Sequence, residues 1–338
     1  MKPVAYIDLF CGMGGFSLGA NRAGATSILA VDSWDEAIDV HRANFPRDPI
    51  RNFKLGMDHQ ISYFETLTRR WKDRGFHVHI HGSPPCQALS TASTTDPSKG
   101  MPLVHWFLRL VYQSNPDSWS MENVVPVRKR LPEYTPSTIL NSADFGVPQT
   151  RRRCFAGYGW EARRSHFESE WVSVIDALPH LKDELEELIA SPSMLKLMVN
   201  TAGVGSSMGR RARSADKAIQ EPSLTIHNNP PSLRLIRLEA LGSNAKRYQD
   251  REITKPSKTI CGSGNQVGPR LFDHDNQKPK KIRSLTMSET LILQGFPGDF
   301  DLSAAKTQKS RWTMVGNAVC PPVAEAVIRG IEYGNVHR

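Results

Sequence analysis

The segment 4–19 constrains the fold of this 338-residue chain more than any other segment. It begins with the apolar run VAYIDLF at 4–10 and continues directly into the glycines of CGMGG. A short, continuously apolar run is typical of a strand that is buried on both faces of a parallel sheet. Glycine lets the backbone turn sharply and come close to a ligand. We therefore predict a buried strand, a tight turn and then a helix at 15–23.

Strands and helices continue to alternate along the first half of the chain. This alternation predicts a doubly wound, mostly parallel α/β sheet. After about residue 158, clusters of Gly, Pro, Ser and Asn interrupt the pattern, which predicts a separate, irregular domain with short helices. Helical periodicity then returns, and prolines open the last helix. The predicted strands are 27–32, 76–81 and 117–122, and the predicted helices are 35–44, 60–74, 101–114, 286–294 and 321–333.

The charge of the chain favours a polyanionic partner. The formal net charge is +9, and residues 200–283 hold 16 Lys and Arg against 7 Asp and Glu, which is the whole surplus. We expect such a segment to contact phosphates, although a basic enzyme with no nucleic-acid partner is the alternative. No apolar run of about 18 residues and no signal peptide are found, so we expect no membrane helix and a cytosolic location.

The pattern of cysteines argues against disulfides and metal binding, and it allows one cysteine to be a nucleophile. They are odd in number, far apart and form no CxxC pair, so we predict neither a disulfide framework nor a metal site. Cys86 differs from the others because it follows two stiffening prolines in GSPPCQALS, directly after the strand 76–81. A nucleophile would occupy this place at the mouth of a sheet, and a buried, inert cysteine is the alternative.

The glycine turn and the end of the second strand together predict a cofactor site. Gly12, Gly14 and Gly15 have the spacing G-x-G-G, which differs from the G-x-G-x-x-G of dinucleotide folds. Asp32 ends the second strand, where an acid can accept hydrogen bonds from both hydroxyls of a ribose. An N-cap of the following helix is the alternative role for Asp32. The pattern indicates a cofactor that contains a nucleoside, and it leaves NAD and S-adenosylmethionine open.

Polar side chains follow the later strands. Glu122, in MENVVP, is expected at the same edge of the sheet as Cys86, where a carboxyl group can hold a base or move a proton. In the extended segment VPQTRRRCF, Arg151 and Arg153 should point to one side and Arg152 to the other. Two guanidinium groups on one side suit phosphate or carbonyl oxygens, and a solvated basic patch is the alternative.

Together these segments resemble the cytosine-5 DNA methyltransferase family of restriction–modification systems. The resemblance covers roughly 1–157 and 283–330, with the motifs in the order of the family. It implies an S-adenosylmethionine-dependent methyltransferase fold, with a catalytic and cofactor-binding domain at 1–158, a smaller target-recognition domain at 159–282 and a return to the first domain at 283–338. The matching segments are DLFCGMGGFSLG, VDSWDEAIDVHRANFP, GSPPCQALS, ENVVP, QTRRRCF, RSLTMSETLILQGFP and VGNAVCPPV.

The resemblance implies S-adenosylmethionine as cofactor and S-adenosylhomocysteine as product. Phe10 would pack against the adenosine beside the glycine turn, and Asp32 would hold the ribose hydroxyls. Asp58, in LGMDHQI, would contact the adenine amino group. Asn317 and Val319 of GNAV would close the pocket from the C-terminal side. Pro84 would complete the cofactor-binding set.

The resemblance also implies a reaction. Cys86 would add to C6 of a cytosine flipped out of duplex DNA, and C5 would then accept the methyl group. Glu122 would hold the N3 and N4 edge, Arg153 would lie near O2, and Arg151 would position the cysteine and the base. In the loop 87–100, Gln87 or Ser90 would fill the space that the cytosine leaves. Arg210, Arg211 and Arg213 would bind DNA, with a flexible, solvated loop as the alternative.

Three alternatives to this activity remain: methylation of cytosine in RNA, a DNA-binding relative without catalysis, and an NAD-dependent enzyme. The Cys-Phe-Thr signature of the family branch that acts on transfer RNA is absent, and Cys86, Glu122 and Arg153 are intact. The segments PPCQ and ENV have no role in an NAD-dependent enzyme. We therefore expect a monomeric enzyme that acts on double-stranded DNA. The sequence leaves open which bases are recognised and whether a restriction endonuclease acts on the same site.

Overall fold

The computed structural model describes residues 2–85, 101–181 and 285–331 with their side chains. Between 182 and 284 it describes only the backbone of the short strands β9 to β14. In this described part of the chain, no helix has both the length and the apolar character that crossing a membrane requires.

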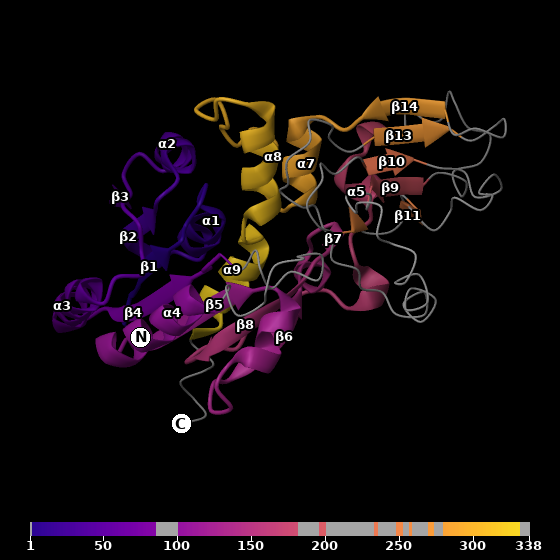
Figure 1. Ribbon diagram of the computed structural model, residues 1–338. Helices are drawn as coiled ribbons and strands as arrows, with labels where there is room; N and C mark the ends of the chain where they lie inside the picture. The colour runs from indigo at the N-terminus through magenta and orange to yellow at the C-terminus, as the bar shows by residue number, and fades with distance from the viewer. Residues whose placement is uncertain are drawn as a thin grey trace, which may run out of the picture.

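A seven-stranded sheet with the order β3-β2-β1-β4-β5-β8-β6 forms the centre of the molecule (Figure 1). The strands pair in parallel from β3 to β5, and β8 runs antiparallel to both β5 and β6. The sheet is therefore doubly wound and mostly parallel, as predicted. Its strands are β1 Val4–Leu9, β2 Thr26–Asp32, β3 Ile50–Asn52, β4 His77–Gly82, β5 Ser118–Asn123, β6 Ser137–Asn141 and β8 Arg152–Tyr158.

The strand order reverses beside β1. The chain proceeds from β1 outward to β2 and β3, and then returns to place β4 on the other side of β1. Ligands of doubly wound sheets bind in the crevice at such a reversal, at the carboxyl ends of the strands. The loops that follow β1 and β4 therefore mark the expected binding edge.

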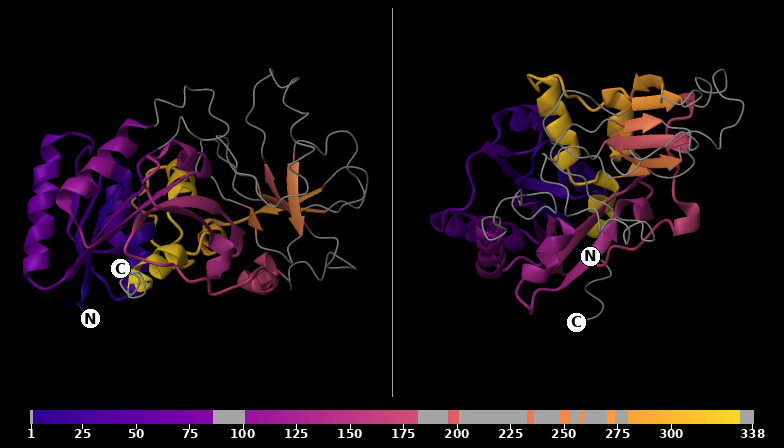
Figure 2. Two further views of the ribbon diagram at one scale, coloured as in Figure 1. Left: turned by 90° about the horizontal axis from the view of Figure 1, so that it is seen from below. Right: turned by 45° about the vertical axis from the view of Figure 1, so that its right-hand side comes forward.

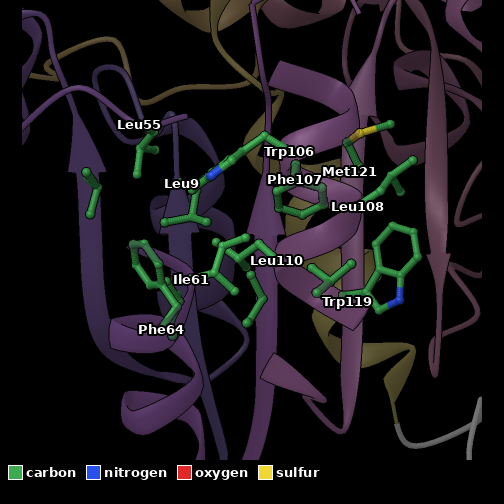
Figure 3. Close-up of a cluster of buried hydrophobic side chains, with 14 of the residues drawn as sticks. Leu9, Leu55, Ile61, Phe64, Trp106, Phe107, Leu108, Leu110, Trp119 and Met121 are labelled. Carbon is green, nitrogen blue, oxygen red and sulfur yellow. The ribbon is translucent and has the colours of Figure 1, made fainter. Parts of the chain in front are cut away.

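Helices cover both faces of this sheet. On one face, Phe64 and Trp106 pack with Leu9 and Trp119 of the strands in one buried apolar cluster (Figure 3). On the other face, α1 packs against α9 so closely that a Cβ at Gly19 would lie 2.2 Å from the carbonyl oxygen of Pro321. The main helices are α1 Gly15–Arg22, α2 Asp35–Asn44, α3 His59–Asp73, α4 Pro102–Ser114, α7 Met287–Leu293, α8 Gln308–Asn317 and α9 Pro321–Arg329.

A second sheet lies beside the first, with α7 and α8 between the two (Figures 1 and 2). Its strands have the order β10-β9-β13-β14, and β11 also pairs with β9. The predicted mixture of short helices is found at the start of this region, in η5 (Glu168–Glu170) and α5 (Val174–Ala177), whereas the described elements between 196 and 284 are strands, which were not predicted. The strands are β9 Lys196–Asn200, β10 Leu233–Leu235, β11 Tyr248–Glu252, β13 Arg270–Asp273 and β14 Lys280–Ser284. A short connection to the first part of the chain pairs β12 (Ser257–Lys258) with β7 (Gln149–Thr150).

Candidate active site

The glycine turn after β1 is held in a tightly wound conformation. Gly12 and Gly14 have φ values of 52° and 95°, and Phe10 has a φ of 60°, which is uncommon for a residue with a side chain. This conformation of Phe10 is held by Ser83, the residue that follows β4, whose Oγ donates a hydrogen bond of 3.1 Å to the Phe10 carbonyl oxygen. The turn after β1 is thus fixed to the residues that follow β4.

Asp32 organises the same turn from the end of β2. Its Oδ2 accepts a hydrogen bond of 2.9 Å from the Gly12 N–H, and its Oδ1 accepts from the N–H groups of Ser33 and Trp34. The N-cap position of α2 belongs to Trp34, so the alternative of Asp32 as the N-cap residue is wrong. Asp32 therefore connects the glycine turn to the start of α2.

The C-terminal segment closes the turn from the opposite side. A Cβ built at Gly15 would lie 2.2 Å from the Val319 carbonyl oxygen and 3.2 Å from the Phe296 ring. Val319 is buried and Asn317, the last residue of α8, is exposed. Only glycine at position 15 allows this approach, which explains why α9 belongs with the first sheet.

The segment before Cys86 is fixed on two sides, although Cys86 itself lies outside the described residues. The N–H of Ser83 donates to the Leu9 carbonyl oxygen at 3.1 Å, and Asn123 Nδ2 donates to the Pro84 carbonyl oxygen at 3.1 Å. Asn123 is the last residue of β5 and is buried. The chain that leads to Cys86 is therefore held between the ends of β1 and β5.

Glu122 and Arg153 form an ion pair beside this segment. The Arg153 Nε lies 3.1 Å from Glu122 Oε1, and each side chain is 10% exposed. Burial raises the pKa of Glu122, while the guanidinium groups of Arg153 and Arg151 act to lower it. A carboxyl group with a raised pKa beside two cations can hold or donate a proton, which suits acid–base chemistry.

A small pocket adjoins the ion pair and reaches the C-terminal segment. Its lining includes Glu122, Arg151, Arg153, Val319 and Cys320. The buried Arg151 donates to the Ala318 carbonyl oxygen at 3.3 Å, whereas Arg152 is exposed, so the predicted alternation of the three arginines is confirmed. A solvated basic patch is therefore wrong for Arg151 and Arg153.

Comparison with known proteins identifies the chain. The family model for C-5 cytosine-specific DNA methylase matches residues 4–135 and 131–333, nearly the whole chain. The chain belongs to this family. It is therefore an enzyme, a methyltransferase that acts on carbon 5 of cytosine in DNA.

Individual relatives agree with this assignment. The Type II methyltransferase M1.HphI of Haemophilus parahaemolyticus is 30% identical over 97% of this methylase and 86% of its own length. The Type II methyltransferase M.HindV of Haemophilus influenzae is 29% identical over 96% of this chain and 95% of its own. A solved protein described as a DNA modification methyltransferase of an E. coli prophage has the same fold, with a TM-score of 0.60 at 22% identity over 99% of this chain and all of its own.

The methylase structure brings together part of the predicted site. Glu122, Arg151, Arg153 and Val319 share one pocket, and Phe10, Gly12, Gly14, Gly15 and Asp32 share the turn beside it. Arg109 contacts both carboxylate oxygens of Asp58, at 2.6 and 3.1 Å, and the contact of Asp58 with adenine stays a prediction. Pro84 lies in the segment held by Asn123, and Asn317 is exposed at the end of α8. Six predicted residues lie outside the described part of the chain: Cys86, Gln87, Ser90, Arg210, Arg211 and Arg213.

Two residues of this region had no predicted role. Cys320 lines the pocket, accepts a hydrogen bond of 3.1 Å from Ser142 Oγ, and has a pKa raised by burial, which favours the neutral thiol. Its place in the matching segment VGNAVCPPV was the available signal. Gln149 is fully buried and donates to the Leu293 carbonyl oxygen at 3.0 Å and to Gln294 Oε1 at 2.7 Å, so it joins β7 to α7.

Proposed function

We propose that this methylase transfers a methyl group from S-adenosylmethionine to C5 of a cytosine flipped out of a specific duplex DNA sequence, through a covalent bond between Cys86 and C6. The observation that carries the proposal is the buried Glu122–Arg153 ion pair beside the segment that leads to Cys86. A nucleophile, an acid and a cation at one edge of the sheet are the groups that this reaction needs.

The residues of the glycine turn fit the proposed cofactor. A Cβ at Gly12 would meet no atom within 4 Å, so the space beside Gly12 is open to a ligand. Asp32 is half-buried at the edge of this space and would hold the ribose hydroxyls, with Phe10 against the adenosine. Gly14, Gly15, Pro84, Asn317 and Val319 would complete the pocket. S-adenosylmethionine, when bound, supplies an electrophilic methyl group, and S-adenosylhomocysteine is the product.

The role of Asp58 in this proposal depends on Arg109. Both carboxylate oxygens of Asp58 are engaged by this guanidinium, and the two side chains are 69% and 54% exposed. Exposed ion pairs contribute little to stability, on the order of 0–1 kcal/mol, so Asp58 can exchange this partner for the adenine amino group at small cost.

The proposed chemistry starts at Cys86. Its thiolate adds to C6 of the cytosine, which breaks the aromatic character of the ring and places electron density on C5. Glu122 holds the N3 and N4 edge, and its raised pKa favours the protonated form that donates to N3. Arg153 stabilises the negative charge that develops at O2, while Arg151 positions the base and the cysteine. C5 would then take the methyl group from S-adenosylmethionine, with S-adenosylhomocysteine as the leaving group. Loss of the C5 proton to a base and departure of Cys86 as a thiolate then restore the ring.

The flipped base implies DNA contacts from segments outside the described residues. Flipping costs a few kcal/mol of stacking and pairing, which Gln87 or Ser90 would offset by filling the vacated space. Arg210, Arg211 and Arg213 would contact phosphates. Replacing these arginines with glutamine should weaken DNA binding and flatten its dependence on salt concentration, and an unchanged salt slope would remove them from the interface.

The biological setting follows from the proposed substrate. We propose a monomer that works in the cytoplasm of a prokaryote, bound to the nucleoid through DNA. The relatives named Type II methyltransferases support a place in a restriction–modification system, in which a restriction endonuclease acts on the same sequence without a stable complex.

Covalent trapping tests the proposal. Duplex DNA that contains 5-fluorocytosine should give a stable adduct with the wild-type methylase in the presence of S-adenosylmethionine, because after methyl transfer the fluorine at C5 cannot leave as a proton does. Cys86→Ser should form no adduct and transfer no methyl group. Transfer of labelled methyl to duplex DNA and to transfer RNA should be measured in parallel, and efficient methylation of the RNA alone would favour the RNA alternative. Methyl transfer by Cys86→Ser at the wild-type rate would refute the mechanism.

A further inference from the structure

A chain of hydrogen-bonded histidine and serine side chains crosses the seam between β4 and β5. We call it the His–Ser ladder, and it consists of His77, His79 and His81 of β4 with Ser118 and Ser120 of β5. Ser118 Oγ bonds to His77 Nε2 and His79 Nδ1, and Ser120 Oγ bonds to His79 Nε2 and His81 Nδ1. Each of these four contacts measures 2.8 Å.

The register of the two strands makes the ladder possible. His79 stands opposite Ser118, and His81 stands opposite Ser120. Because side chains alternate along a strand, all five members point to the same face of the sheet. His79, His81, Ser118 and Ser120 have no exposed surface. Buried polar groups of this kind are costly unless they are paired, and each serine hydroxyl of the ladder pairs with two ring nitrogens.

The protonation state of His79 makes the hydrogen bonds of the ladder all run the same way along it. Burial, with a smaller effect from His77, lowers the pKa of His79 to about 3, so this ring is neutral at physiological pH. A neutral imidazole has one N–H and one lone pair, and His79 must therefore donate to one serine and accept from the other. The orientation of each hydroxyl follows from that choice. The loss of a single hydroxyl thus removes a hydrogen-bond partner from two ring nitrogens.

One end of the ladder lies directly beneath the candidate active site. The next side chain after Ser120 on the same face of β5 is Glu122, and β4 ends at Gly82, four residues before Cys86. The ring of Phe16, the second residue of α1, stacks on His81 with a centroid distance of 3.6 Å and an interplanar angle of 2°. The His81 end therefore touches the elements that carry the acid, the thiol segment and the glycine turn.

We propose that the Ser120 end of the His–Ser ladder is a positioning device for the methylation reaction, in which Ser120, bonded to His79 and His81, fixes the strand end that carries Glu122 relative to the segment that leads to Cys86. Backbone hydrogen bonds align β4 with β5. The ladder adds a set of side-chain hydrogen bonds between the two strands, and one end of it lies at the edge where the chemistry occurs. A displacement of about 1 Å in such a site can reduce a rate about 100-fold. The inference rests on the proposed function of Glu122 and Cys86.

Ser118 provides a matched control for Ser120. Both hydroxyls are fully buried, each bonds to two histidines, and both lie on the same face of the same strand. They differ in distance from the active edge, since Ser120 is two residues closer to Glu122. Ser118→Ala and Ser120→Ala should therefore lower the thermal midpoint by similar amounts. Only a positioning role predicts that their effects on the rate differ.

The experiment measures single-turnover methyl transfer with saturating duplex DNA and S-adenosylmethionine. We expect Ser120→Ala to be slower than wild type by about tenfold or more, with Ser118→Ala within about threefold of wild type. We also expect the KM for S-adenosylmethionine to change less than the rate in both variants. Equal losses of rate in the two variants would show a purely structural role and would overturn the proposal, as would wild-type rates in both.

A third variant separates the ladder from the proposed function. Glu122→Gln should abolish most of the activity if Glu122 holds the base as proposed. An inactive Glu122→Gln together with a fully active Ser120→Ala would refute only the ladder. Full activity in Glu122→Gln would refute the proposed role of Glu122, and with it the reason for positioning that strand end.

Discussion

His41 of α2 makes a sharp test of how burial controls stability. It is fully buried, its ring lies 4.9 Å from the Phe45 ring, and its Cε1 would be 3.2 Å from a Cβ at Gly14. Burial, and to a lesser extent the charge of Arg42, lower its pKa from 6.5 to about 4. The folded protein therefore holds His41 neutral under conditions in which the unfolded chain binds a proton.

The size of the effect follows from proton linkage. Because the pKa of His41 is lower in the folded state, the contribution of neutral His41 to stability is present above pH 6.5 and is lost as the pH falls toward 4. With these two pKa values, His41 costs about 0.2 kcal/mol at pH 7 and about 2 kcal/mol at pH 5. His41→Leu removes this titration. The stability advantage of wild type over His41→Leu, whatever its value at pH 7, should therefore shrink by about 1.8 kcal/mol at pH 5.

The assay is urea unfolding at pH 7 and pH 5, followed by tryptophan fluorescence. Comparing each variant with wild type at the same pH cancels the titration of all other groups, including Asp8, whose pKa shifts in the opposite direction. The same substitution at His59, which is exposed on α3, is the control for replacing a histidine outside the core. A difference for His41→Leu that stays constant between pH 7 and pH 5 would refute the argument.

Three further predictions concern residues around the site. Burial raises the pKa of Asp8 from 3.8 to about 7, so the contribution of Asp8 to stability is lost as the pH rises through 7. In urea titrations, the free energy of unfolding of Asp8→Asn should therefore rise by about 1.4 kcal/mol relative to that of wild type between pH 6 and pH 8. Gly15→Ala would force a Cβ into the Val319 carbonyl oxygen, and calorimetry should show at least tenfold weaker binding of S-adenosylhomocysteine; unchanged affinity would contradict the proposed pocket. Gln149→Leu removes two buried hydrogen bonds and should lower the free energy of unfolding by about 1–3 kcal/mol, while Gln113→Leu at an exposed position of α4 serves for comparison.

The first part of the fold could be predicted from sequence because its signals are local. The helix at 35–44 was predicted with its observed bounds, and the strands β1, β2, β4 and β5 lie within one or two residues of their predicted places. Each begins or ends at a glycine, a proline or a change of hydrophobic period. β3 was not predicted, because its three residues are too few to show a hydrophobic period. α8 was not predicted either, because its buried residues Trp312, Met314 and Val315 form no regular apolar stripe.

The candidate site was predicted in composition and only partly in geometry. The alternation of Arg151, Arg152 and Arg153 is a local property of extended chain, so it could be foreseen. The pairing of Asp58 with Arg109 joins α3 to α4 and depends on how those helices pack. Likewise, the alternating histidines of HVHIH were visible in the sequence, but their serine partners depend on the register of two strands 39 to 41 residues apart.

The direction of β8 explains why the acid and the cation of the site meet. Glu122 is near the carboxyl end of β5, and in an all-parallel sheet the first residues of the next strand would lie at the opposite edge. β8 runs antiparallel to β5, so β8 begins at the edge where β5 ends. Arg153 is the second residue of β8 and therefore lies at this edge. Glu122 stands opposite Phe155, and alternation returns Arg153 to the same face. The single reversed strand therefore places a guanidinium group against the buried carboxyl group without a long loop.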